Sequence, residues 1–155
     1  MRPLGASVGR AADLGPLLIR LGVGVVFAVH GWQKFSDGVG NFAGFLESLD
    51  VPLSDIVAWL QVVAEGVGGV LLVLGLFTRL ATLPLIATMV GAILLVKVDV
   101  GFVEPDATGA ELDVALLAGL LGLLFLGPGR YSLDAIMGME ATATPLALGG
   151  SRLNA

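Results

Sequence analysis

The stretch Ile56–Phe77, IVAWLQVVAEGVGGVLLVLGLF, decides the fold of this chain. It contains no proline and a single ionisable side chain, Glu65, which lies close to its centre. As a helix with a rise of ~1.5 Å per residue, it is long enough to cross the ~30 Å hydrocarbon layer of a bilayer. A carboxylate that faces lipid at that depth is unfavourable by on the order of 3 kcal/mol, so we expect Glu65 to face protein or water.

The composition extends this interpretation to the whole chain. Of its 155 residues, 56% are hydrophobic and only 14% are charged, and the mean hydropathy is +0.95. A soluble domain of this size could not bury so many apolar side chains. The sequence therefore predicts an all-α, polytopic membrane protein. The absence of cysteine excludes disulfides and cysteine-bound clusters, and the net charge of −5 without a basic patch argues against nucleic acid as a partner.

Four apolar runs with short connections predict one domain, a four-helix transmembrane bundle over residues 14–129. The predicted spans cover about residues 14–33, 56–77, 80–98 and 110–127. Residues 1–13 are expected to form a cytoplasmic arm, and residues 130–155 a weakly ordered cytoplasmic tail. Between the first two spans, apolar residues at helical spacing predict a short amphipathic helix at the membrane interface: Phe42, Phe45, Leu46 and Leu49.

The distribution of charge predicts how the bundle is oriented. Four spans place both chain ends on one side of the membrane. All arginines outside the spans lie in the two tails and the second connection, whereas the first and third connections are acidic. By the positive-inside rule, the sequence predicts a multi-pass protein of a bacterial plasma (inner) membrane with both termini in the cytoplasm.

Six ionisable residues are the candidate functional groups of the bundle: Arg20, His30, Lys34, Glu65, Lys97 and Glu111. Arg20 and Glu65 lie within the predicted spans, and their depths differ by on the order of 7 Å, which a guanidinium arm can bridge. We therefore predict an Arg20–Glu65 pair that fixes the register of two helices. No residue is assigned a catalytic role, and no metal site is predicted.

The other candidates gather at the predicted outer end of the bundle. His30 and Lys34 share one helix face, and Lys97, Glu111 and Asp113 reach the same level. Lys97 alone is expected to be an interfacial anchor. For His30, whose imidazole titrates near neutral pH, a structural and a functional role both remain open.

Small residues spaced four apart predict close contacts between the helices. Such rows are Gly24–Ala28 in the first span, Ala64–Gly68 in the second, and Ala115–Gly119 with Ala118–Gly122 in the fourth. They indicate packing rather than a function.

Three segments together, LLIRLGVGVVFAVHGWQKF, AEGVGGVLLVLGLFTRLA and GPGRYSLDA, resemble the DoxX family of small bacterial four-helix membrane proteins. The resemblance covers roughly Leu17 to Asp134. It implies that the polar positions of the family fall on Arg20, His30, Lys34, Glu65, Arg79 and Glu111, and its terminal motif on residues 127–130. Lys97 stands where relatives often place a histidine. The family name comes from a subunit associated with thiosulfate:quinone oxidoreductase, and the resemblance implies a place in membrane redox complexes.

Three functions follow as hypotheses. The first is a membrane subunit of an oxidoreductase or oxidative-stress complex with protein partners, in which a quinone is the cofactor that the bundle could hold. The second is a small proton-coupled transporter, which would require a homo-oligomer. The third is a structural scaffold that recruits soluble enzymes to the bilayer. The sequence leaves open whether the protein is itself an enzyme.

Overall fold

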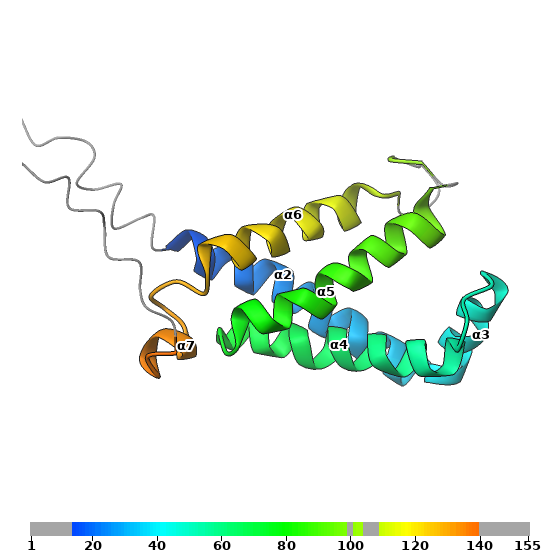
Figure 1. The fold of residues 1–155 in the computed structure, drawn as a ribbon, viewed down its shortest axis with the longest axis horizontal. Coiled ribbons are helices and arrows are strands. Elements are labelled where there is room, and N and C mark those ends of the chain that lie inside the picture. The colour runs from blue at the N-terminus through cyan, green and yellow to red at the C-terminus, as the bar shows by residue number, and fades with distance from the viewer. Residues whose placement is uncertain (1–13, 99–100, 104–108, 140–155) are drawn as a thin grey trace, which may run out of the picture.

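The computed structural model describes residues 14–98, 101–103 and 109–139, and within them it is entirely helical (Figure 1). The predicted arm over residues 1–13 and most of the predicted tail, residues 140–155, lie outside the described residues. The elements in chain order are α2 (Leu14–Ser36), α3 (Val39–Ser48), α4 (Ser54–Leu74), α5 (Thr78–Ala92), the π-helical turn η1 (Ile93–Lys97), α6 (Glu111–Leu126) and α7 (Leu133–Ile136).

Four of these helices form an elongated bundle. Helix α2 packs along α4, and α5 packs against both α4 and α6. Figure 1 shows α4 and α5 meeting at one end, beside α7, and diverging toward the other end, where α3 folds across. We call these the α7 end and the α3 end of the bundle. The short helix expected between the first two spans is confirmed as α3.

Three helices are long and apolar enough to cross a membrane: Leu14–Ser36, Ser54–Leu74 and Thr78–Lys97. The structure thus supports three of the four predicted spans. Helix α6 has 16 residues and a length of ~24 Å, which is shorter than the apolar layer of a bilayer. A fourth crossing by α6, and with it the side on which the chain ends lie, stays a prediction.

Glycines bring the backbones of α2 and α4 into contact. A Cβ atom on Gly31 would lie 2.3 Å from the backbone nitrogen of Gly66, and one on Gly69 would lie 2.4 Å from that of Ala28. The predicted Gly24–Ala28 row therefore does face α4. Gly68, from the predicted row on α4, faces Leu85 of α5.

The apolar interior is divided into two clusters. The larger one joins α2, α4, α5 and α6 through fully buried side chains that include Phe27, Leu72, Leu85 and Leu120. The smaller one fixes α3 on α4 through Val39, Ala43, Leu46, Ala58 and Val62. Between the two clusters lie the polar groups and the cleft described next.

Candidate functional site

A buried ion pair joins α2 and α4 between the two apolar clusters. The ammonium group of Lys34 lies 2.6 Å from each carboxylate oxygen of Glu65. Glu65 is 1% exposed and Lys34 is 25% exposed, so the lysine forms the outer side of the pair. The Nε2 atom of Gln61, one turn earlier on α4, donates to Glu65 at 3.3 Å. Two donors therefore hold this carboxylate away from the lipid, as expected for Glu65.

The predicted Arg20–Glu65 pair was wrong, because the register of α2 against α4 separates the two residues. Gly31 lies against Gly66, so Glu65 faces the last turns of α2, where Lys34 reaches it. Arg20 lies against Gly75, which is ten residues, or ~15 Å of helix rise, from Glu65. The prediction that a neighbouring helix neutralises Glu65 is correct, but the cation is Lys34.

Arg20 belongs to a second polar site at the α7 end. It is 1% exposed, and its Nη2 group donates to the carbonyl oxygen of Tyr131. Gly75, with φ of 68°, leaves the space for the guanidinium, since a Cβ atom there would lie 1.4 Å from Nη1. Arg20 thus connects α2, the α4–α5 turn and the segment that leads into α7.

Asp134 completes this site from the other side. Its two carboxylate oxygens accept hydrogen bonds from the backbone N–H groups of Phe77 and Thr78 at 2.7 and 2.9 Å, and its own N–H donates to Gly75. The carboxylate therefore caps the first turn of α5, where it also favours the helix dipole. The expectation of a weakly ordered tail from residue 130 onward was wrong for residues 130–139. The segment GPGRYSLDA was the signal, but its aspartate was not recognised as a buried cap.

We expect Asp134→Ala to lower the free energy of unfolding by ~2–3 kcal/mol, because two backbone donors at the start of α5 lose their acceptors. Asp134→Asn retains one acceptor and should lose about half as much. Asp37→Ala, which removes an exposed carboxylate at the end of α2, is the matched control and should stay within ~0.5 kcal/mol of the parent. Unfolding in mixed micelles with increasing SDS measures all three. An effect of Asp134→Ala no larger than the control would contradict this role.

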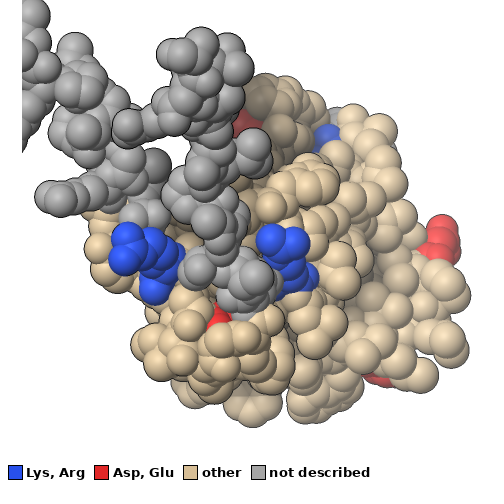
Figure 2. Space-filling view, turned by 60° about the vertical axis from the view of Figure 1, so that its left-hand side comes forward, with Lys and Arg blue, Asp and Glu red and all other residues tan. Residues whose placement is uncertain are grey.

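Figure 2 shows the molecule with the α7 end brought forward, where separate basic groups stand on a largely uncharged surface. The arginines that the chain places beside the α4–α5 turn and the α6–α7 connection are Arg79 and Arg130. The second connection and the C-terminal segment therefore bring arginines together at one end, as their distribution in the sequence predicted.

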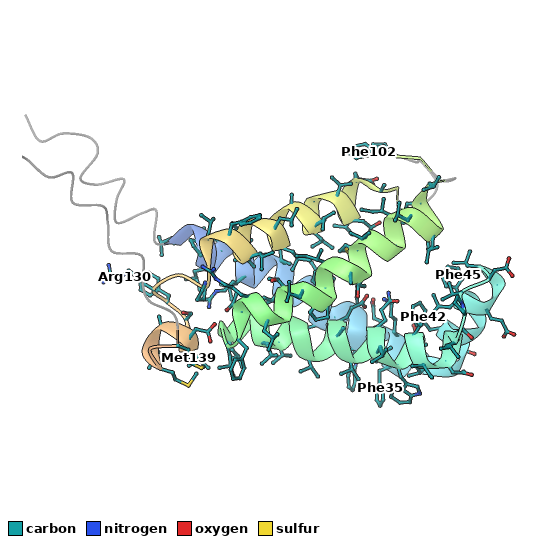
Figure 3. The ribbon with its side chains drawn as sticks, viewed as in Figure 1. Phe35, Phe42, Phe45, Phe102, Arg130 and Met139 are labelled. Atoms are coloured by element: carbon teal, nitrogen blue, oxygen red, sulfur yellow. The ribbon has the colours of Figure 1, made fainter. Side chains whose placement is uncertain are left out.

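A cleft of about 810 Å³ opens between α4 and α5 on the side covered by α3. Its polar lining groups are Lys34, Gln61, Thr88 and Lys97, and the remaining lining residues are apolar or glycine. Phe42 and Phe45 of α3 close its outer end, and the Lys34 ammonium lies 4.8 Å from the centroid of the Phe42 ring (Figure 3). Lys34 thus lines the cleft, and its partner Glu65 lies behind it.

Three local features of α5 create this cleft. Small residues, Ala87, Gly91 and Ala92, face α4 where larger side chains would fill the space. Pro84 is the seventh residue of α5, and its missing N–H leaves the Leu80 carbonyl without a helical partner. The π-helical turn η1 then carries Lys97 to the rim, and wider turns of this kind are frequent at functional sites.

The remaining candidates gather at the α3 end, as expected. Asp113 of α6 lies within electrostatic range of Lys97, His30 and Lys34. One carboxylate oxygen of Glu111 and one of Asp113 are buried without a hydrogen-bond partner among the described residues. Lys97 also lines the cleft, and its role as an interfacial anchor stays a prediction.

Gln61 and Phe42 were not among the predicted site residues. Gln61 is four residues before Glu65 in an otherwise apolar span, a spacing that places both on one helix face. Phe42 was recognised as part of the amphipathic helix, but its position over Lys34 depends on how α3 folds back.

The family model that describes DoxX matches residues 15–98 of this chain, from the start of α2 to η1. The chain belongs to the DoxX family. The match covers Glu65 and the whole cleft lining, from Lys34 to Lys97, so the candidate site lies within the part of the chain that defines the family.

Two of the curated relatives are named as membrane proteins. An uncharacterized membrane protein of Mycobacterium tuberculosis is 42% identical over 138 residues, which cover 82% of this chain and 83% of that protein. The Bacillus subtilis protein named "Putative oxidoreductase CatD" is 32% identical, over 82% of this chain and 90% of its own length. The inner membrane protein YphA of Escherichia coli is 30% identical, over 81% and 92%. No solved structure matches this chain. These matches and the three long apolar helices establish a multi-pass membrane protein of the DoxX family.

Proposed function

We propose that this protein is a membrane subunit of a bacterial inner-membrane oxidoreductase complex, and that the cleft between α4 and α5 binds the head of a quinone. The observation that carries the proposal is the position of the Lys34–Glu65 pair, which places charged and amide donors at the wall of an otherwise apolar cleft. The name of the Bacillus subtilis relative supports a redox role.

The residues of the cleft fit a quinone in size and polarity. Its volume of about 810 Å³ lies within the ~300–1,000 Å³ of typical small-molecule sites, and aromatic and aliphatic side chains dominate its walls. An ammonium group has three N–H donors, so Lys34 can hold both Glu65 oxygens and still donate to a carbonyl oxygen. The side-chain N–H₂ of Gln61 offers a second donor.

The charge around the cleft favours a neutral head over an anionic one. Two lysines, Lys34 and Lys97, line it, and two carboxylates, Glu65 and Asp113, lie beside them, so their formal charges cancel. Glu111, close to Asp113, adds a further negative charge. No net positive charge is left to hold a phosphate or carboxylate, whereas a carbonyl oxygen needs only donors.

A quinone held here would supply two-electron, two-proton redox chemistry. The chain contains no cysteine to ligate an iron–sulfur cluster or to act as a redox thiol, so in this proposal the electrons come from a partner subunit. The role of this chain is to bind and orient the head with Lys34 and Gln61, and to keep water away from it with Phe42.

We expect Gln61→Leu to weaken quinone binding by about tenfold while the free energy of unfolding changes by less than ~1 kcal/mol, because the substitution removes one donor but leaves the ion pair. Gln33→Leu, at an exposed position of α2, is the control and should bind like the parent. The measurement is quinone titration of the protein in lipid nanodiscs, together with quinone analysis of protein extracted in mild detergent. Protein that neither retains nor binds quinone would refute the proposal and favour a structural scaffold.

A further inference from the structure

The cleft is much longer than the head of a quinone. On α5 and η1 its lining residues extend from Pro84 to Lys97, a helix rise of roughly 20 Å. The donors Lys34, Gln61 and Lys97 stand at the α3 end of this length. Toward Pro84 the polar lining residue is Thr88, whose hydroxyl donates to the carbonyl oxygen of Pro84 at 3.1 Å and is thus occupied within its own helix. The far part of the cleft therefore offers a ligand only apolar contacts.

The cleft also opens sideways. Three of its lining residues are largely exposed: Leu60 at 65%, Val63 at 52% and Leu95 at 53%. They lie on α4 and on the continuous helix formed by α5 and η1, both of which are long and apolar enough to span the membrane. Figure 1 shows that these two helices diverge toward the α3 end. The open side of the cleft is therefore bordered by exposed apolar side chains on two helices that are able to span a membrane.

We infer that the ligand of this cleft carries a long apolar chain, which lies along α5 toward Pro84 and leaves between α4 and α5 into the bilayer. The inference rests on the proposed function for the head of the ligand. It adds an apolar chain, which would bury most of the ligand's apolar area. Because the ligand chain enters from lipid and does not leave water, its contribution comes from van der Waals contacts along the apolar wall of the cleft.

Two small residues of α5, Ala87 and Gly91, line the proposed path of the ligand's apolar chain. A Cβ atom on Gly91 would meet nothing within 4 Å, although Gly91 lines the cleft, and Ala87 lines it one turn nearer to Pro84. A leucine at either position would extend into the cleft without displacing a neighbour of Gly91. The absence of larger side chains at these two positions therefore leaves room for the apolar chain of the ligand.

The test compares methyl-naphthoquinone without a side chain with the same head carrying two isoprene units. Both are titrated into the parent protein, Gly91→Leu, Ala87→Leu and the control Gly22→Leu, which also meets open space but lies on α2 away from the cleft. Protein is held in nanodiscs, and concentrations are expressed as mole fraction in the lipid, so that partitioning into the bilayer does not count as binding. Thermal unfolding of each variant confirms that it is folded.

We expect the parent and Gly22→Leu to bind the chain-bearing quinone at least about tenfold more tightly than the chainless one. Gly91→Leu and Ala87→Leu should remove this difference and leave the affinity for the chainless quinone unchanged. Equal affinities for both quinones in the parent would overturn the inference but not the proposed function. Cleft variants that weaken the binding of both quinones by the same factor would do the same. Binding of neither quinone would overturn both.

Discussion

Replacing Gly31 with leucine is expected to prevent α2 and α4 from packing together. Its Cβ atom would lie 2.3 Å from the backbone nitrogen and 2.6 Å from the Cα atom of Gly66. Backbone atoms in the middle of a helix cannot move aside as a flexible side chain can. The two helices would have to separate along the contact that also aligns Lys34 with Glu65. We expect a loss of ~3 kcal/mol or more in the free energy of unfolding, at the upper end of overpacking effects.

Gly22→Leu provides the matched control for this prediction. It makes the same chemical change on the same helix, but a Cβ atom there meets nothing within 4 Å, and the variant should unfold within ~0.5 kcal/mol of the parent. Unfolding in mixed micelles with increasing SDS, followed by the fluorescence of Trp32 and Trp59, measures both. If Gly31→Leu were as stable as Gly22→Leu, the close contact of α2 with α4 described here would be wrong.

Removing Glu65 should have the second large effect, on stability and on binding together. Glu65→Leu leaves the Lys34 ammonium at the wall of the apolar cleft without its carboxylate. Breaking a fully buried pair typically lowers stability by ~3–5 kcal/mol, but Lys34 is 25% exposed and keeps part of its hydration. We therefore expect a loss of ~2–3 kcal/mol. Quinone binding should fall at least about tenfold, because the released ammonium is no longer held at the head site.

The double variant Lys34→Met/Glu65→Leu separates the structural role of the pair from its role in binding. Apolar side chains of similar size often replace a buried pair without loss of stability, so the free energy of unfolding should return to within ~1 kcal/mol of the parent. Quinone binding should not return, since the donor is absent. Glu47→Gln, at an exposed position of α3, is the control for both measurements. A double variant that binds quinone like the parent would show that the pair only supports the fold.

Local sequence patterns determined the elements of this protein and the surroundings of its central acid. Long apolar runs predicted the three spans, and the spacing of Phe42, Phe45 and Leu46 predicted α3. The burial of Glu65 followed from the free energy of a carboxylate in lipid alone. Each of these results depends on the chain within one helix and on the properties of the bilayer.

Only the tertiary structure decided which groups meet. Glycine contacts between antiparallel helices set the register of α2 on α4. In that register Glu65 pairs with Lys34, and Arg20 donates a hydrogen bond to the carbonyl oxygen of Tyr131. Arg20 lies against Gly75, ten residues from Glu65, so a different register would have given Glu65 a different partner, and composition is insensitive to the register. The cap by Asp134 and the cleft beside Lys34 depend on contacts between residues far apart in the chain, 56 positions from Asp134 to Thr78. The physical reason is that periodicity defines the face of a helix, whereas the fit of one surface against another defines the site.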